Sequence, residues 1–588
     1  MAAKSRFVLQ RLFNGLRTQS LWLQSSKSTS SQGRPSSLSF RTHTCGELRS
    51  DHVGDKVTLC GWVQYLRQDL FVILRDFTGL TQILIPQEES ASGLKSALCD
   101  LTVESVIQVT GTVRLRPSGQ ENKGMPTGEI EVLAENVEIF NICQKLPFEI
   151  KDFVKKSESL RMQYRYLDLR SSQMQQNLRL RSQVVMKMRD YLCNVQGFVD
   201  VETPTLFKRT PGGAKEFVVP SREPGMFYSL PQSPQQFKQL LMVAGVDRYF
   251  QIARCYRDEG SKPDRQPEFT QVDIEMSFVE QAGIMSLVEG LLQHSWPPEK
   301  GPIKVPFHTM KYEEAMRDYG VDKPDTRFNM KLIDLSEVFS ASDVEFLRSA
   351  LSKPGGTVQA ICVPGGANLF TGKTLDELKQ AAKTQFGQRP LLGHLRLQSA
   401  QLLESSGVTL RDPSAFHFLW VVDFPLFLPK EDKPEELESA HHPFTAPLPE
   451  DSQLLYTEPH KVRGQHYDLV LNGSEIGGGS IRIHKAAEQH HVLKNILKED
   501  TTLLSHLLEA LDSGAPPHGG IALGLDRLIS IMVGANSIRD VIAFPKSFRG
   551  HDLMSRAPDS LSEEELNAYH ISVKWPTKHE RCEEDERK

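Results

Sequence analysis

Residues 249–278 constrain the fold more than any other stretch, because two apolar, strand-like runs flank a loop that carries charges of both signs. Only one residue separates Arg257 from Glu259, so both side chains can address one ligand at the end of a strand. A guanidinium suits a phosphate, since its planar fork makes two charge-assisted hydrogen bonds. A carboxylate beside it can accept from an exocyclic amine. The pattern favours a bound nucleotide, although a surface ion pair is the competing interpretation.

A second arginine site lies far along the chain, in residues 515–531. Gly519 and Gly520 allow close approach of the backbone. An apolar run follows them, and the residues from Gly524 to Arg527 then open a predicted helix. Two arginine sites at strand ends make a nucleotide-binding enzyme a stronger interpretation than chance ion pairs.

These two stretches resemble motifs 2 and 3 of the class II aminoacyl-tRNA synthetases, and residues 197–206 resemble motif 1, whose proline matches Pro204. The resemblance implies ATP as a substrate, catalytic roles for Arg257 and Arg527, and a homodimer formed through motif 1 with Pro204 at its interface. The ATP-binding residues that it implies are Arg257, Asp258, Glu259, Gln266, Glu475, Gly524, Leu525, Asp526 and Arg527.

Residues 232–242 resemble the signature of the aspartyl members of that class. Two cations, Lys238 and Arg482, would then face the side-chain carboxylate of L-aspartate, because an unpaired buried charge is very costly to desolvate. The adjacent pair His441 and His442 is less suited to bind a metal, since neighbours on a strand point in opposite directions. The implied aspartate-binding residues are Ser233, Gln235, Lys238, Arg257, Asp273, His441 and Arg482.

Asp468 and Glu475 are the carboxylates that the resemblance assigns to Mg²⁺, a cation that prefers oxygen ligands. They are seven residues apart, a spacing that does not by itself put both on one face of a flat strand. A bulge or a turn at Asn472 and Gly473 would correct the spacing.

Five short β-runs (57–63, 70–76, 80–86, 106–115 and 130–139) predict an OB-type barrel, a common platform for single-stranded nucleic acid. Phe71 and Gln82 lie on the second and third runs, and Arg67 lies in the turn before them. An aromatic ring can stack on an unpaired base, and an amide can read a base edge. The resemblance implies that Arg67, Phe71 and Gln82 bind the anticodon of tRNA(Asp).

The first 46 residues contain no Asp or Glu and are rich in Ser and Arg, with an apolar stripe at helical spacing. Such a segment is typical of an organelle transit peptide, and a disordered basic tail is the alternative. It predicts a mitochondrial matrix protein. No apolar run approaches the ~20 residues needed to cross a bilayer. The eight cysteines include no Cys-x-x-Cys pair, which argues against a zinc site.

The sequence therefore predicts a multidomain α+β protein: an OB-type barrel, then a class II synthetase catalytic domain built on an antiparallel sheet, with an inserted α/β domain. The inserted domain is expected to be shortened, to expose apolar surface and to be sensitive to proteases near 372–397. The expected divisions are 1–46 transit peptide, 47–142 barrel, 143–172 linker, 173–327 first catalytic part, 328–412 insertion, 413–555 second catalytic part and 556–588 C-terminal extension.

We expect ATP-dependent attachment of L-aspartate to tRNA(Asp) through an aspartyl-adenylate. Two alternatives remain: an asparaginyl enzyme, or an RNA-binding paralogue whose catalysis is impaired by the short insertion. Lys238 and Arg482 argue against the first, because two cations prefer a carboxylate to an amide. The intact set of charged motif residues argues against the second.

Overall fold

The computed structural model describes residues 39–573, except 68–69, 89–92, 95–97, 99–100, 152–153, 211–212, 261, 354, 374, 377 and 379–390. The predicted transit peptide up to residue 38, and much of the stretch 372–397 expected to be sensitive to proteases, lie outside the described residues. The chain divides into two compact units, Met1–Glu149 and Ile150–Lys588.

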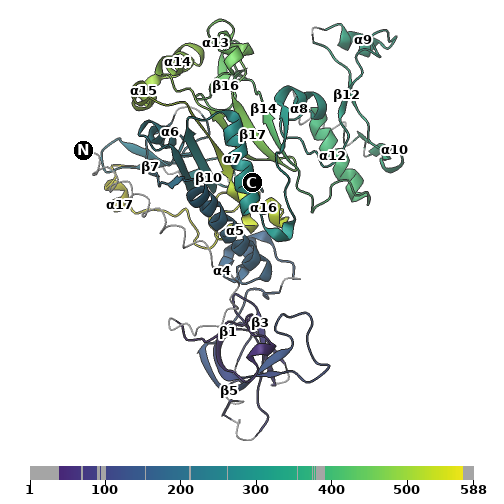
Figure 1. The fold of residues 1–588 in the computed structure, drawn as a ribbon, viewed down its shortest axis with the longest axis vertical. Coiled ribbons are helices and arrows are strands. Elements are labelled where there is room, and N and C mark those ends of the chain that lie inside the picture. Colours follow the sequence, from purple (N-terminus) through teal and green to yellow (C-terminus); the bar gives the residue numbers. More distant parts are fainter. Residues whose placement is uncertain are drawn as a thin grey trace, which may run out of the picture. The chain divides into compact units, whose positions relative to one another are not determined.

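The first unit contains a closed five-stranded barrel in the order β1-β2-β3-β5-β4 (Figure 1). Buried and less buried residues alternate along β1 and β4, so every second side chain enters the barrel core. The five predicted runs are confirmed as β1 (Lys56–Arg67), β2 (Phe71–Arg75), β3 (Leu80–Leu84), β4 (Val106–Leu115) and β5 (Ile130–Asn141).

The second unit is built on an eight-stranded sheet in the order β11-β14-β17-β18-β19-β10-β9-β6. All neighbouring pairs are antiparallel except β11 with β14 and β6 with β9. The predicted antiparallel catalytic sheet is therefore confirmed. Its strands are β6 (Val199–Asp200), β9 (Arg248–Tyr256), β10 (Glu268–Ser277), β11 (His308–Lys311), β14 (Phe418–Val422), β17 (His466–Leu471), β18 (Ser474–Ile481) and β19 (His518–Gly524).

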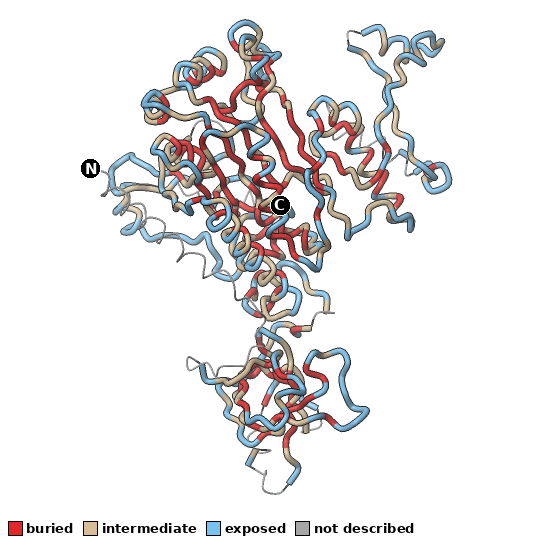
Figure 2. Tube along the Cα trace, viewed as in Figure 1, coloured by how far each residue is buried: buried red, intermediate tan, exposed pale blue. Residues whose placement is uncertain are grey.

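Three helices, α5 (Ser172–Asp190), α7 (Gln281–Ser295) and α16 (Leu525–Val533), share a hydrophobic core with this sheet. Figure 2 shows the buried trace concentrated in the sheet and the helices beside it. Val184 of α5 and Leu291 of α7 belong to the same buried cluster as Trp420 of β14. The sheet is thus a rigid platform for the side chains at its strand ends.

Shorter elements complete the second unit. The apolar run 416–428 divides between β14 and β15 (Phe427–Pro429), with Asp423 at a φ of 59° between them. The helices are α3 (Glu158–Gln163), α4 (Arg165–Asp168), α6 (Gln235–Val243), α8 (Tyr312–Tyr319), α13 (Leu454–Thr457), α14 (Ala486–His491), α15 (Ser505–Asp512) and α17 (Glu563–Asn567); the two-stranded sheets are β7 (Val218–Pro220) with β8 (Phe227–Ser229) and β15 (Phe427–Pro429) with β16 (Leu437–Ser439).

The stretch expected to be a linker, 143–172, is divided between the two units. The first unit ends at Glu149, whereas α3 and α4 belong to the second. Arg165 is buried in α4, pairs with Asp168, and donates hydrogen bonds to the carbonyls of Arg539, Ile542 and Ala543. The end of this stretch is therefore an integral part of the second unit.

The described part of the predicted insertion contains a two-stranded sheet, two short helices and one longer helix. Its buried cluster is small, consisting of Phe328, Met330 and Ala400 with a few partly buried neighbours. Val338 and Phe346 are each 72% exposed. These exposed side chains agree with the expectation that the insertion leaves apolar surface uncovered. Its elements are β12 (Leu332–Asp334), α9 (Glu345–Leu351), β13 (Gln359–Ile361), α10 (Gly366–Leu369) and α12 (Leu391–Ser405).

Candidate active site and anticodon surface

A cavity of about 570 Å³ lies in the second unit, where residues from both predicted arginine motifs meet. Its wall comes from the β9–β10 loop, the start of β18, and the junction of β19 with α16. Seven of the nine predicted ATP-binding residues form part of this wall. Those that line the cavity are Arg257, Glu259, Gln266, Glu475, Gly524, Asp526 and Arg527.

Local sequence explains why these side chains meet. β9 and β10 are long antiparallel neighbours, so the charged loop between them is held at the ends of these strands. β19 pairs with β10 on its other side, and Gly524 ends that strand opposite Gln271. α16 begins at the next residue, which confirms the predicted strand-to-helix junction. It also brings Arg527 to the same end of the strands.

Arg257 has the features of an anion-binding group. Its guanidinium lies over the ring of Phe269, 5.0 Å from the ring centroid. Its Nε atom is buried and has no hydrogen-bond partner among the described residues. A buried, charged donor without a partner is costly, so this arrangement favours a bound anionic ligand.

Arg527 is held by main-chain and side-chain acceptors. Nη1 donates to the carbonyl of Glu475 at 2.5 Å, and Nη2 lies 3.4 Å from the carboxylate of Asp264. The Glu475 carboxylate in turn pairs with Lys323, whose Nζ is 2.5 Å from Oε2. Lys323 also lines the cavity and was not singled out in the sequence.

Two other predicted ATP-binding residues have clear structural roles. One carboxylate oxygen of Asp526 pairs with Arg181 at 2.5 Å, and the other accepts from the Thr270 amide at 2.8 Å. Gln266 exchanges two hydrogen bonds with the main chain of Lys546. Both side chains therefore shape the cavity wall.

Asp258 and Leu525 are not among the residues that line the cavity. Asp258 is exposed, and its amide donates to the Lys215 carbonyl at 2.8 Å. Leu525 is buried in the hydrophobic core of the sheet and its helices. For Leu525, only the main chain at the start of α16 remains available to a ligand.

Asp468 and Glu475 come together through a bulge. Asp468 pairs with Gly478 and Val470 pairs with Glu475, and the register shifts between Leu469 and Val470. That shift puts Glu475 on the face of the sheet that Asp468 occupies. A Cβ atom on Gly478 would lie 2.6 Å from Asp468 Oδ1 and 3.5 Å from Glu475 Oε1, so both carboxylates face this glycine.

The irregularity that brings Asp468 and Glu475 to one face is therefore present, but it is a bulge in β18 rather than the turn itself. Asn472 and Gly473 form the hairpin turn with positive φ values of 52° and 82°, while the bulge itself lies further along β18. Glycine at 478 is needed because a side chain there would collide with Asp468.

The two carboxyl groups differ in acidity. Burial and the charge of Glu475 raise the pKa of Asp468 well above its usual range. Burial would also raise the pKa of Glu475, but the charges of Lys323 and Arg527 outweigh it and lower that pKa. The pair is thus a site that gains from a further positive charge.

The predicted amino acid pocket begins on β10, next to the residues of that strand that line the nucleotide cavity. Gln271, Asp273 and Glu275 alternate along β10 and so share one face. Gln271 lines the nucleotide cavity, and Ala522, opposite Asp273, also lines it. Residues of the two sites are therefore neighbours on β10 and β19.

Lys238 and Arg482 converge as predicted, and both are buried. Lys238 Nζ lies 3.2 Å from Asp273 and 3.2 Å from Glu275. Arg482 binds both oxygens of Glu275 and donates to the Ser480 hydroxyl at 2.7 Å. The cations predicted to face a ligand are anchored by a carboxylate of the chain itself.

Glu275 was missed because nothing in its local sequence separates it from other strand glutamates. Burial favours its neutral form, but Arg482 and Lys238 outweigh burial and lower the pKa of Glu275 to about 2. A Cβ atom on Gly520 would lie 2.1 Å from the Glu275 carboxylate. Gly520, near the start of β19, thus makes room for Glu275, which gives a physical reason for a glycine in that motif.

Among the remaining predicted aspartate-binding residues, Ser233 and Gln235 lie at the start of α6, and Asp273 lies on β10. Ser233 is half-buried just before α6. Gln235, in the first turn of α6, is buried and donates to Gln239 at 3.2 Å. Asp273 has a buried Oδ2 atom with no partner among the described residues, and burial raises its pKa.

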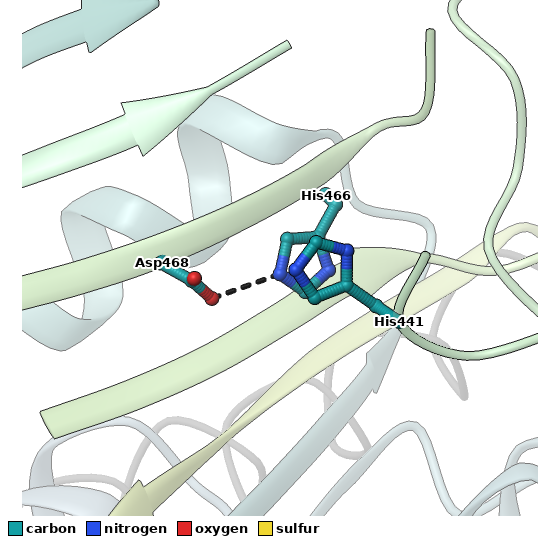
Figure 3. A group of neighbouring side chains, drawn as sticks. All are labelled: His441, His466 and Asp468. Carbon is teal, nitrogen blue, oxygen red and sulfur yellow. Dashed lines mark hydrogen bonds and ion pairs between the residues drawn. The ribbon is translucent and has the colours of Figure 1, made fainter. Parts of the chain in front are cut away.

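His441, His466 and Asp468 form a compact group, with ligand atoms within 4.8 Å of one another (Figure 3). His466 was not singled out in the sequence. The two rings stack, with centroids 3.6 Å apart and 16° between their planes. Ring-nitrogen lone pairs lie in the ring plane, so parallel rings do not direct both nitrogens at one ion.

The group is better explained as support for Asp468. His466 Nε2 is hydrogen-bonded to Asp468 Oδ1 at 2.8 Å. Burial lowers the pKa of His466 to about 3, so the ring is neutral at pH 7. A neutral imidazole fixes the orientation of the carboxyl group without adding charge.

A cavity of about 550 Å³ on the barrel brings together the three predicted anticodon-binding residues, Arg67, Phe71 and Gln82. Gln82 Nε2 donates to Glu131 at 2.8 Å, which leaves its Oε1 as an acceptor. Arg116 and Glu131 also line this cavity, and sequence reasoning did not find them. Arg116 carries a buried Nη2 atom without a partner among the described residues.

Pro204, predicted for a dimer interface, lines a separate surface cavity of about 520 Å³ beside β6. Apolar side chains are exposed on the neighbouring elements. They are Met186, Val195, Val199 and Leu206. In the part of the chain that the structure describes, no helix combines the length and apolarity needed to cross a membrane.

Comparison with known families gives two matches. The model of class II tRNA synthetases (D, K and N) matches residues 157–548, and that of the OB-fold nucleic acid binding domain matches residues 57–140. These ranges correspond to the eight-stranded sheet with its helices and to the barrel.

Two relatives are similar along almost their whole length. "Aspartate--tRNA ligase, mitochondrial" of Homo sapiens is 62% identical, over 97% of this chain and 98% of its own. The Bos taurus protein of the same name is 62% identical over 614 positions, covering 95% of this chain and 94% of its own.

Among solved structures, asparaginyl-tRNA synthetase from Pyrococcus horikoshii, complexed with asparaginyl-adenylate, aligns with a TM-score of 0.57. The alignment covers 86% of this chain and 98% of that one at 19% identity. At this identity the likeness concerns the fold alone.

Proposed function

This chain belongs to the class II tRNA synthetases of the aspartate, lysine and asparagine group, and from that membership we propose that it attaches L-aspartate to tRNA(Asp) in mitochondria, with ATP as co-substrate. Relatives at 62% identity carry the name of that activity. The structural observation that carries the proposal is that the arginine-lined cavity includes residues of β10, the strand that also carries the carboxylates that bind the buried Lys238 and Arg482.

The two buried cations support aspartate as the amino acid. Lys238 and Arg482 share one carboxylate, Glu275, between them. Lys238 also contacts Asp273, which is proposed to pair with the α-ammonium group of the ligand. A ligand side-chain carboxylate would then balance three cations with three anions, whereas the amide of asparagine would leave positive charge uncompensated. The alternative of an asparaginyl enzyme is not favoured.

In the first step, an oxygen of the aspartate α-carboxylate forms a bond to the α-phosphorus of ATP. The bond from that phosphorus to the bridging oxygen breaks, and pyrophosphate leaves with the electron pair. The nucleophile is already an anion, so no side chain needs to remove a proton. The work of the protein is to orient the reactants and offset developing charge, with Arg257 at the α-phosphate and Arg527 at the terminal phosphate.

In the second step, the terminal hydroxyl of the tRNA attacks the carbonyl carbon of the adenylate, and AMP leaves. Asp273, whose Oδ2 lacks a partner among the described residues, is suited to bind the α-ammonium group. Ser233 and Gln235 would complete that end of the pocket, and His441, which is exposed, would cover it. These roles remain predictions.

Asp468 and Glu475 fit a Mg²⁺ ion, because both are carboxylates that face one glycine and gain from added positive charge. When bound, Mg²⁺ would offset the charge of the phosphate chain. His466 would then keep Asp468 oriented through its hydrogen bond.

The impaired-paralogue alternative depends on the insertion. The bovine alignment spans more positions than the 588 residues of this chain, in agreement with a shortened segment. Its position in 328–412 remains a prediction. The charged residues around the nucleotide cavity are complete, which favours an active enzyme.

The barrel is proposed to bind the anticodon. Phe71 would stack on an unpaired base, Gln82 would accept through Oε1, and Arg67 would contact the backbone. All three line one cavity of the barrel. The fixed amide orientation of Gln82, set by Glu131, makes the amide a reader of base edges.

A homodimer through motif 1 is supported by exposed apolar surface. Val199 belongs to β6, the edge strand of the eight-stranded sheet, and is 52% exposed. Together with Pro204 and its apolar neighbours, it offers a surface that a second copy would cover. Analytical ultracentrifugation should report a dimer, and Val199→Asp should shift it toward monomer.

The mitochondrial matrix is the proposed location, because the acid-free segment 1–46 is typical of a transit peptide. A fusion of residues 1–46 to a soluble reporter should enter mitochondria and resist added protease after outer-membrane rupture. A diffuse cytosolic signal would contradict this address.

Aspartate-dependent exchange of pyrophosphate with ATP tests the reaction itself. We expect exchange with L-aspartate and none above background with L-asparagine, followed by charging of tRNA(Asp). Exchange that prefers asparagine would identify the alternative amino acid. Absence of exchange with either, in a folded protein that still binds tRNA, would identify the impaired paralogue.

A further inference from the structure

Lys323 is a cation of the nucleotide cavity that neither arginine motif contains. It lies between α8 and the predicted insertion. Its Nζ is 2.5 Å from Glu475 Oε2, and its side chain is 37% exposed. It lines the same cavity as Arg257, Arg265 and Arg527, so cations from three separate segments border one space.

The main chain around Lys323 is fixed from the side of the β17–β18 hairpin. Asp325, two residues on, is buried and accepts three hydrogen bonds from Arg327. A Cβ atom on Gly473, in the hairpin turn, would lie only 2.9 Å from Asp325 Cβ. The turn that carries Glu475 therefore packs tightly against the segment that carries Lys323.

The same segment is fixed from the other side by α12. The buried guanidinium of Arg396 donates to the carbonyls of Asp325, Phe328 and Met330, at 2.9, 2.8 and 3.0 Å. It also lies over the Phe328 ring, 3.8 Å from the centroid. With both sides anchored, the backbone at Lys323 is held while its long side chain can still change rotamer.

A half-exposed ion pair with Glu475 would by itself contribute little to stability. A lysine ammonium offers three donors, and one carboxylate oxygen uses only part of that capacity. The space in front of it is the cavity bordered by Arg257, whose Nε lacks a partner among the described residues. Such a convergence of donors is suited to the oxygens of a polyphosphate.

We propose that Lys323 binds the phosphate chain of ATP and the pyrophosphate that leaves. This inference rests on the proposed function for its nucleotide. As the bond between the α-phosphorus and the bridging oxygen breaks, negative charge grows on the pyrophosphate oxygens. The ammonium of Lys323 offsets that charge while keeping its protons, so its role is electrostatic.

Lys323→Met removes the charge and keeps most of the side-chain stem, and Lys323→Arg keeps the charge. Lys331→Met is the matched control, because Lys331 is on the same segment, is also partly exposed and pairs with Asp318. Calorimetric titration with magnesium pyrophosphate should show binding weakened about ten- to hundredfold by Lys323→Met, the range for a hydrogen bond to a charged group. The KM for ATP should rise in parallel, the KM for aspartate should change less than about twofold, and Lys323→Arg should restore part of the affinity.

Unchanged pyrophosphate affinity and unchanged KM for ATP in Lys323→Met would overturn the proposal and leave a structural ion pair. Amine acetylation of the unaltered protein, followed by peptide mass spectrometry, tests the proposal without any substitution. Magnesium ATP should protect Lys323 and leave Lys331 as reactive as before. Equal reactivity of Lys323 with and without ATP would also overturn it.

Failure of the proposed function gives a different result. An unaltered protein without aspartate-dependent exchange would contradict the proposed reaction. Pyrophosphate titration and ATP protection would still report whether Lys323 binds phosphate.

Discussion

Arg482 grips both carboxylate oxygens of Glu275, with Nε 3.0 Å from Oε1 and Nη2 3.2 Å from Oε2. Both side chains are buried, and Lys238 shares the same carboxylate. A residue assigned to substrate specificity is therefore also part of an internal charge network. Any test of Arg482 has to separate these two roles.

Replacement of Arg482 alone should lower stability as well as aspartate affinity. Arg482→Leu leaves Glu275 buried beside a single cation, and breaking a buried pair costs about 3–5 kcal/mol. Urea unfolding should show a loss of that size, and exchange kinetics should show a steep rise in the KM for aspartate with little change for ATP.

The double variant Glu275→Leu/Arg482→Leu separates the roles. It should recover much of the lost stability, because no uncompensated carboxylate remains. Its aspartate affinity should stay low. Equal weakening of ATP and aspartate in Arg482→Leu would assign Arg482 a purely structural role.

Arg257→Ala should abolish adenylate formation while the protein stays folded. Its guanidinium has a buried Nε without a partner among the described residues, so little internal bonding is lost. The rate of exchange should fall by far more than tenfold. A tenfold loss alone corresponds to ~1.4 kcal/mol of transition-state stabilisation. Arg317→Ala, an exposed arginine on α8, is the control and should keep full activity. Activity of Arg257→Ala within about tenfold of the parent would contradict the assignment.

Phe71→Ala should weaken charging of tRNA while pyrophosphate exchange stays normal. Stacking of one base is worth ~1–3 kcal/mol, so kcat/KM for tRNA should fall about fivefold or more. Phe77→Ala is the matched control, since Phe77 is an exposed aromatic of the same barrel that does not line the cavity. A defect in exchange would indicate that the substitution had damaged the fold.

Acid should destabilise the protein partly through His442. The Phe444 amide donates to its Nδ1 at 3.4 Å, so that nitrogen carries no proton. Burial, together with the charges of Arg482 and Lys238, lowers the pKa of His442 to about 3. In the unfolded chain a histidine has a pKa of ~6.5. The native pKa is the lower one, so this contribution is complete above pH ~6.5 and is lost as the pH falls toward 3.

The contribution of this residue to the unfolding free energy should change by up to about 1.4 kcal/mol per pH unit. Urea unfolding of the parent and of His442→Gln at pH 7.5, 6.5 and 5.5 measures it as the difference between the two proteins. His460→Gln replaces an exposed histidine and should follow the parent. If the unfolding free energies of His442→Gln and of the parent change equally with pH, the prediction that the native state keeps His442 unprotonated is wrong.

The insertion should expose apolar surface that contributes little to stability. Phe346 is 72% exposed, and α9, which carries it, has no buried residue. Phe346→Ser should change the unfolding free energy by less than about 0.5 kcal/mol. It should also reduce binding of a hydrophobic dye, with exchange activity unchanged. A large loss of stability would instead mean that Phe346 belongs to a core.

Local patterns in the sequence determined the elements of this fold. Short β-runs separated by turn residues predicted all five barrel strands, because strand propensity and turn chemistry are properties of the local sequence. Glycines before an apolar run, followed by an arginine, likewise predicted the junction of β19 with α16. Residue types at these strand ends were enough to predict phosphate and carboxylate chemistry.

Tertiary structure decided which side chains, distant in the sequence, form ion pairs. Lys323 and Glu475 are 152 positions apart, and Arg482 and Glu275 are 207 apart, so no local pattern connects them. The bulge in β18 changed the face on which Glu475 lies, and that depends on pairing with β17. A strand's periodicity is a local property, but the partner of a buried charge is fixed only when separate strands and helices pack together.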